Sequence, residues 1–386
     1  MLLQILITIG AAQAISFASL NLLKKNRKQA DYLLSLELFL LFLITMIYNY
    51  HDTLRFDYPN LPLNAYVLAY LAVPVFYLYI KSATRGALPF AWKDLIHFLP
   101  FVLVNLILWQ QFYQLPFSTK VGIIEGFHDH ICPTWYYGMY YVLFLGLFPF
   151  YLYRSFNLLS RHETCILTRF SYTEDLSLSW LQRFLWGMII TWVAFISFEV
   201  VANQMLGLTG SYGFQVAFLF MVANIFYLGI SGVQQKVILE DESLLDAEED
   251  AAKYQLSSLT DDKAKDYLKK LTNYMEREKP YLEPRITIAE LAQRVGIPVN
   301  YLSQIINRDL EQNFFDFINT YRVKEFKHLL QTPNSQQYTL LSLAHEAGFN
   351  SKSTFNAIFK KITGQTPSEY ARAVTKSGTL STEPLK

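Results

Sequence analysis

The chain has 386 residues, of which 52% are hydrophobic, 16% aromatic and only 17% charged. An average soluble protein carries about 25% charged residues, so this composition excludes an ordinary soluble domain and a disordered chain. The formal net charge of +1 says little about partners, because it averages two unlike halves of the sequence. The two cysteines, Cys132 and Cys165, are too few for a disulfide framework.

The first 233 residues alternate long apolar runs with short polar breaks. Each run is near the roughly 20 residues that a helix needs to cross a bilayer, so the pattern predicts seven transmembrane helices. The runs are Leu2–Leu23, Asp31–Tyr50, Leu63–Ile80, Leu95–Tyr113, Thr134–Tyr153, Leu181–Leu206 and Gly213–Val233.

The basic residues between these runs predict the orientation. Alternate breaks are rich in Lys and Arg, whereas the other breaks hold only Arg55 and Lys120. By the positive-inside rule the N-terminus lies outside and the C-terminus in the cytoplasm. The inner basic residues are Lys24, Lys25, Arg27, Lys28, Lys81, Arg85, Lys93, Arg154, Arg161, Arg169 and Arg183.

A few polar side chains fall within the predicted spans. Glu199, Asn203 and Gln204 share one helical stretch, and we interpret them as a candidate ligand site or polar network. We expect Asn105 and Asn224 to hydrogen-bond across helices, and Glu37 to lie near the inner face. The outer loop 114–133 holds metal-ligand residue types without a second supporting cluster, so we predict no metal site. We also predict no cofactor and no enzyme activity, since Walker, HExxH and GxSxG motifs are missing.

An acidic segment, 234–261, follows the last span and contains the run LEDESLLDAEEDA. It fits either a solvated helical extension or a signalling helix that pairs with a second copy. Asp262–Lys279 is then predicted to form an amphipathic helix.

The last third of the chain carries one pattern twice. TIAELAQRVGIPVNYLSQII begins at Thr287, and TLLSLAHEAGFNSKSTFNAIF begins at Thr339. Each copy reads as a short helix, a glycine turn at Gly296 or Gly348, and a second helix, which is the helix-turn-helix shape that enters the DNA major groove. Thr287 and Glu290 form a predicted capping box. The second helices are expected at about Pro298–Asn307 and from a cap at Ser351 to Ile362, with a long connecting helix at Phe314–Leu330.

The second copy and its tail, GFNSKSTFNAIFKKITGQTPSEY, resemble the signature of the AraC/XylS family of transcription regulators. The first copy resembles it through YLS at Tyr301–Ser303 and NTYRV at Asn319–Val323. The resemblance covers about residues 262–372 and implies two recognition helices on one face of the duplex. The residues that it implies read bases are Asn300, Ser303, Gln304, Lys352, Ser353, Asn356 and Ala357. Those expected to contact phosphates are Arg308, Arg322, Lys360 and Lys361.

This sequence departs from the family pattern at three positions. The family often has Arg where this chain has Gln304 and Ala357, which puts guanine recognition there in doubt. The third is Glu311, whose counterpart in the second copy is Gly364.

These observations predict an all-α protein, with a seven-helix transmembrane bundle (1–233), the acidic linker (234–261), an AraC-like DNA-binding domain (262–376) and a disordered tail (377–386). The first part resembles membrane portions fused to such regulators in bacteria, which implies a multi-pass protein of the inner membrane. We expect a one-component transcription regulator that binds promoter double-stranded DNA and RNA polymerase, forms a homodimer and answers to an unknown ligand of the membrane domain. The alternatives are a transporter or sensor whose helical domain is a regulatory module, or spans that act only as a tether.

Overall fold

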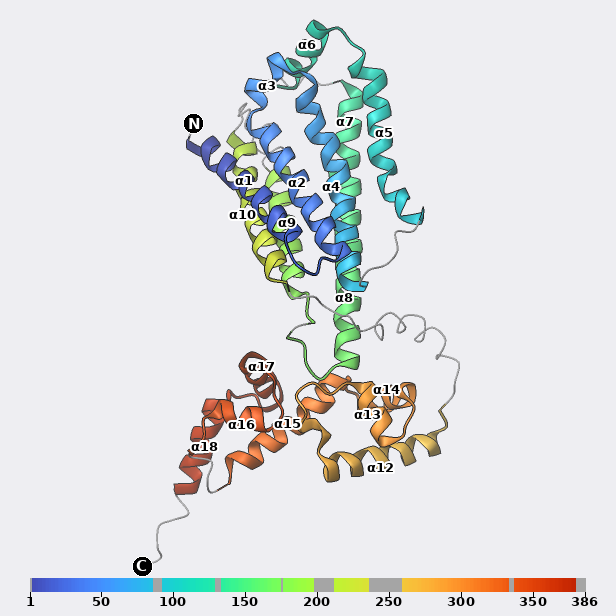
Figure 1. Ribbon diagram of the computed structural model, residues 1–386, viewed down its shortest axis with the longest axis vertical. Coiled ribbons are helices and arrows are strands. Elements are labelled where there is room, and N and C mark those ends of the chain that lie inside the picture. The colour runs from blue at the N-terminus through green and yellow to red at the C-terminus, as the bar shows by residue number, and fades with distance from the viewer. Residues whose placement is uncertain are drawn as a thin grey trace, which may run out of the picture. The chain divides into compact units, whose positions relative to one another are not determined.

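The computed structural model describes residues 2–85, 92–128, 133–174, 176–197, 212–235, 259–332 and 337–379. Within these ranges the backbone is helical or irregular apart from an isolated bridge between Phe170 and Thr287, which confirms the all-α prediction there. The chain divides into two compact units (Figure 1). Unit 1 comprises residues 1–161 and 178–241, and unit 2 comprises residues 162–177 and 242–386.

Unit 1 is a bundle of long apolar helices. Helices α1, α2 and α4 lie side by side, and α10 packs against α1 and α9 (Figure 1). Its elements are α1 (Leu2–Leu22), α2 (Gln29–Asn49), α3 (His51–Asp57), α4 (Asn60–Arg85), η1 (Trp92–Phe98), α5 (Leu99–Leu108), η2 (Trp109–Tyr113), α6 (Phe117–His128), α7 (Thr134–Tyr141), η3 (Val142–Leu147), the part of α8 (Phe148–Arg169) before residue 162, α9 (Ser179–Ser197) and α10 (Tyr212–Gln234).

Five helical stretches of the described residues are long and apolar enough to cross a membrane. They are Leu2–Leu22, Gln29–Asn49, Asn60–Thr84, Trp92–Tyr113 and Thr134–Arg169, and Phe218–Gln234 is a shorter apolar helix. They coincide with the first five predicted spans, whereas the count of seven stays a prediction. Many large apolar side chains on the outside of these helices are exposed, such as Ile9, Phe39 and Leu106. An apolar exterior of this kind suits a hydrocarbon environment better than water.

The polar side chains within unit 1 have different surroundings from one another. The Asn224 amide donates to the Thr191 hydroxyl at 2.9 Å, so this residue bridges α10 and α9 as predicted. Asn105 instead donates to the carbonyl of Phe101 in its own helix. Glu37 is buried and lines a cavity, and its expected depth near the inner face stays a prediction. The predicted network of Glu199, Asn203 and Gln204 lies outside the described residues.

Unit 2 has two apolar cores that share one helix. Phe314, Phe317 and Ile318 of α15 enter the first core, whereas Val323 and Phe326 enter the second. The long connecting helix thus holds the two repeats together, as the sequence predicts. The helices of unit 2 are α12 (Asp261–Glu278), η6 (Pro280–Leu282), α13 (Ile288–Val295), α14 (Val299–Arg308), α15 (Phe314–Leu330), α16 (Leu340–Glu346), α17 (Lys352–Thr363) and α18 (Pro367–Thr379).

Two predicted domain boundaries differ from the structure. Residues 162–177 lie between two predicted spans, yet they belong to unit 2. Helix α18 continues to Thr379, so the first residues of the predicted disordered tail are helical. Most of the acidic linker, residues 236–258, falls outside the described ranges.

Candidate nucleic-acid interface

The first helix-turn-helix unit consists of α13 and α14. The Thr287 side chain accepts a hydrogen bond from the Glu290 N–H at 3.2 Å, and a Glu290 carboxylate oxygen accepts from the Thr287 N–H at 2.8 Å. This is the predicted capping box. Gly296 ends α13 with φ 68°, a left-handed conformation that glycine adopts without steric cost. Helix α14 then buries Leu302, Ile305 and Ile306, and its opposite face is polar.

The second unit consists of α16 and α17. Helix α17 is capped by Ser351, whose hydroxyl accepts from the Thr354 N–H at 3.2 Å. Its apolar side chains Phe355, Ile358 and Phe359 are buried. Gly348 in the turn has φ 93°, and a Cβ atom there would lie 2.4 Å from the carbonyl oxygen of Tyr281. A glycine is therefore required at this close approach.

Both α14 and α17 are followed by a left-handed residue, but only one of these residues is a glycine. Gly364 has φ 76° and Glu311 has φ 52°. A side chain in this region costs about 1–2 kcal/mol. The departure at Glu311 is therefore a site of local backbone strain in the first repeat.

The residues expected to read bases fall on the polar faces of the two second helices. In α17, Lys352, Ser353, Asn356 and Ala357 are exposed. In α14, Asn300, Ser303 and Gln304 are half-buried. All seven therefore lie on helices whose opposite sides are held by a core, and their reading of bases stays a prediction.

Three of the four expected phosphate-contacting residues are also exposed. Arg308 forms an ion pair with Asp309 at 2.7 Å, and Lys361 forms one with Asp316 at 2.8 Å. Lys360 is exposed beside Lys361 at the end of α17. Arg308 and Lys361 would have to exchange a carboxylate partner for a phosphate on binding DNA, which reduces their net contribution.

Arg322 is buried, with only 1% of its surface exposed, so its expected phosphate contact is wrong for this conformation. Its guanidinium donates to four backbone or side-chain groups within 3.1 Å. These bonds are from Nε to the Tyr281 carbonyl at 2.8 Å, from Nη1 to the Ser171 carbonyl at 2.9 Å, and from Nη2 to the Glu283 carbonyl at 2.7 Å and the Ser171 hydroxyl at 3.1 Å. Burial lowers the pKa of Arg322 to about 10, and the negative charge of Glu174 opposes that shift, so the side chain stays cationic at neutral pH.

The Arg322 contacts belong to a docked segment, which we define as residues 162–177. Besides its bonds to Arg322, the segment pairs with the loop before α13, because the Ser171 N–H donates to the Ile286 carbonyl at 3.3 Å. Leu167 packs against the second core, and the Arg285 guanidinium lies 5.3 Å from the centre of the Tyr172 ring. The docked segment is therefore an integral part of unit 2 in this structure.

Glu174 of the docked segment lies at the start of the second recognition helix. Burial alone would raise the pKa of its carboxyl group. Interactions with the side chains of Thr354 and Ser351 and with backbone N–H groups lower the pKa, and together they outweigh burial, so the net shift is downward. Its Oε2 atom accepts a hydrogen bond from the Thr173 N–H at 3.1 Å, and the buried Oε1 atom has no hydrogen-bond partner. Glu174 therefore carries a negative charge at the positive end of the α17 dipole.

Sequence reasoning missed this segment because nothing in it resembles a DNA-binding motif. It was interpreted only as a basic inner loop between two spans. The one available signal is that Arg322 lies at helical spacing from the apolar residues Ile318 and Phe326, on the inward side of α15, where an arginine needs several acceptors.

The comparisons with known proteins support a regulatory C-terminal part. Residues 291–373 match the family described as a helix-turn-helix domain, so this part of the chain carries an AraC-type helix-turn-helix domain. An uncharacterized HTH-type transcriptional regulator of Staphylococcus aureus (strain COL) is 30% identical over 114 residues, which are 30% of this chain and 14% of that protein. The melibiose operon regulatory protein of Escherichia coli (strain K12) is 29% identical over 87 residues, which are 22% of this chain and 28% of that protein.

The matched part of the chain thus spans well under two thirds of the length of either relative. No solved structure matches the chain.

Proposed function

We propose that this protein is a membrane-anchored transcription regulator that binds specific promoter sequences through α14 and α17. The observation that carries the proposal is the pair of helices α14 and α17, each with a polar outward face and an apolar inner face. Helix α15 fixes the two helix-turn-helix repeats to each other, because it contributes side chains to both apolar cores of unit 2. The apolar helices of unit 1 supply the bilayer anchor, which fits the inner membrane of a bacterium with unit 2 in the cytoplasm. RNA polymerase and a second copy of the chain are its proposed protein partners.

The docked segment gives this regulator a means of control. It lies in the sequence between the fifth and sixth predicted spans, so a movement of those spans would pull directly on Ser171 and Glu174. DNA phosphates commonly bind at the N-termini of recognition helices, because N–H groups and the helix dipole favour anions there. Glu174 holds that position at α17 with its own negative charge. We therefore infer that the docked segment weakens DNA binding and that its release strengthens it.

The function is tested by a binding selection on random duplex DNA at two salt concentrations. The full chain in lipid nanodiscs is used, because a C-terminal fragment alone would lack Ser171 and leave Arg322 without its acceptors. Enrichment of a site with two halves about one helical turn apart is the expected result. Salt-sensitive binding without an enriched sequence would leave only a basic surface and would contradict the proposal.

Two substitutions then assign the readout to the predicted helices. Gln304→Ala in α14 and Asn356→Ala in α17 should each cost about 1–3 kcal/mol on the selected site and much less on random DNA. Each variant should lose preference at its own half of the site. Equal losses on both DNAs would show that these side chains do not read bases.

A further inference from the structure

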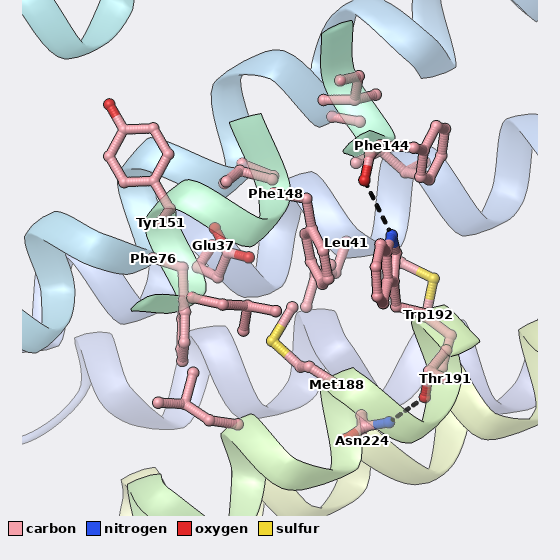
Figure 2. Close-up of a pocket in the computed structure, with 18 of the residues that line it drawn as sticks. Glu37, Leu41, Phe76, Phe144, Phe148, Tyr151, Met188, Thr191, Trp192 and Asn224 are labelled. Carbon is pink, nitrogen blue, oxygen red and sulfur yellow. Dashed lines mark hydrogen bonds between the residues drawn. The ribbon is translucent and has the colours of Figure 1, made fainter. Parts of the chain in front are cut away.

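Unit 1 has a partly open cavity of about 210 Å³ between α2, α4, η3, α8, α9 and α10, shown in Figure 2. Its walls are almost entirely apolar, and aromatic rings supply much of them. These rings are Tyr48, Tyr66, Phe76, Phe144, Phe148, Tyr151, Phe184, Trp192 and Phe218. Since an apolar cavity of about 150 Å³ holds benzene, this one has room for a benzene-sized ring with a short side chain.

Several polar groups in the wall have hydrogen-bond partners within the protein. The Asn224 amide donates to Thr191, and the Trp192 indole N–H donates to the Phe144 carbonyl at 3.1 Å (Figure 2). Glu37 differs, because only 3% of its surface is exposed and its Oε2 atom has no hydrogen-bond partner. A buried carboxyl oxygen without a donor is unfavourable, so this position calls for a donor from outside the chain.

The surroundings of Glu37 restrict what that donor can be. A cationic donor would gain both from the carboxylate and from the negative faces of the aromatic rings. An anion has no proton to donate to the unpaired oxygen, and the ionised form of Glu37 would repel it. The rest of the ligand should be mainly hydrocarbon, because the remaining walls are almost entirely apolar.

We propose that this cavity binds a small lipophilic amine, with its ammonium group on Glu37 and its apolar body against the aromatic walls. The claim that this amine is the signal for the regulator rests on the proposed function. The claim that it binds unit 1 does not. Glu37 lies near the middle of α2, a helix that packs against both α1 and α4. A charge pair formed there is positioned to alter the packing of three helices.

The test is a direct binding measurement on the full chain in phosphatidylcholine nanodiscs, without DNA. The probes are 2-phenylethylamine, 2-phenylethanol and 3-phenylpropionate, with empty nanodiscs as the blank for partition into lipid. We expect saturable binding and a raised melting temperature with the amine, binding at least tenfold weaker with the alcohol, and none with the acid. Equal binding of amine and alcohol, or no saturable binding of the amine, would overturn the proposal.

Two variants and a matched control locate the site. Glu37→Gln keeps the size of the side chain and removes its charge, so it should weaken amine binding at least tenfold and leave the alcohol unchanged. Met188→Trp should fill the cavity and weaken both probes. Glu125→Gln, an equal charge change at an exposed position of α6 outside the cavity, should alter neither. Amine binding that Glu37→Gln leaves unchanged would refute the site, whatever the DNA selection shows.

Discussion

Replacing Glu174 by Gln should increase the affinity of the full chain for DNA. The change keeps the shape of the side chain at the start of α17 and removes the negative charge. A phosphate seated about 6 Å from this carboxylate, at an effective dielectric between about 20 and 80, would be repelled by about 0.7–2.8 kcal/mol. The dissociation constant should therefore fall by about 3- to 100-fold.

The assay is a titration of fluorescent duplex DNA with the protein in nanodiscs at constant salt. The matched control is Glu163→Gln, which removes the same charge from an exposed position of the docked segment. Melting temperatures of both variants would show whether unit 2 stays folded. If Glu174→Gln gains no more affinity than Glu163→Gln, or if it loses affinity, the inferred inhibitory role of Glu174 is incorrect.

Four other outcomes follow from the geometry of unit 2. Glu311→Gly should stabilise unit 2 by about 0.5–1 kcal/mol in urea unfolding, because it removes the strain of a left-handed residue with a side chain. Gly364→Ala should destabilise unit 2 for the same reason. No gain in stability from Glu311→Gly would rule out strain at that position. Arg322→Leu should cost about 3–5 kcal/mol, because buried acceptors lose their donor; a neutral effect would contradict the burial of this network. Lys360→Ala should weaken binding to all DNA sequences and reduce the salt slope by about 0.9, with unchanged stability. The Arg294 guanidinium holds the pKa of Glu283 in the folded protein below its value in the unfolded chain. This pair therefore stabilises the fold at a pH above the unfolded-chain pKa of Glu283, and the stabilisation is lost as the pH falls through its folded-state pKa. The free energy of unfolding of Glu283→Gln should depend less on pH over that range.

The repeats of unit 2 could be predicted closely because their signals are local. A capping threonine, a glycine turn and apolar residues at helical spacing predict α13, α14 and α17 to within a residue or two of their observed ends. Lys352, Ser353 and Asn356 are exposed for the same reason, since they are opposite Phe355 and Phe359 on the same helix.

The parts that escaped prediction depend on contacts between distant residues. Arg322 looked like a phosphate ligand because it is basic and close to the recognition helices, but its acceptors come from Ser171, about 150 residues earlier. The sequence indicates the place of Glu37 along its helix, but it does not predict that the side chain is buried against a cavity. The side that it faces is set by which helices pack around α2, and one sequence does not contain that information.

The shared helix α15 also has a consequence for the DNA that this protein can use. Phe314 and Phe315 are adjacent, yet one enters each core, so the two repeats are fixed in angle as well as in distance. Inserting one residue into α15 would rotate one repeat by about 100° against the other, and only a whole number of turns would nearly restore the phase. One added turn moves the repeats apart by about 5.4 Å, which is not a whole number of base-pair steps of about 3.4 Å. If α14 and α17 read the two halves of one promoter site, the spacer between those halves is tied to the length of a single protein helix, and the promoter and α15 can change their spacing only together.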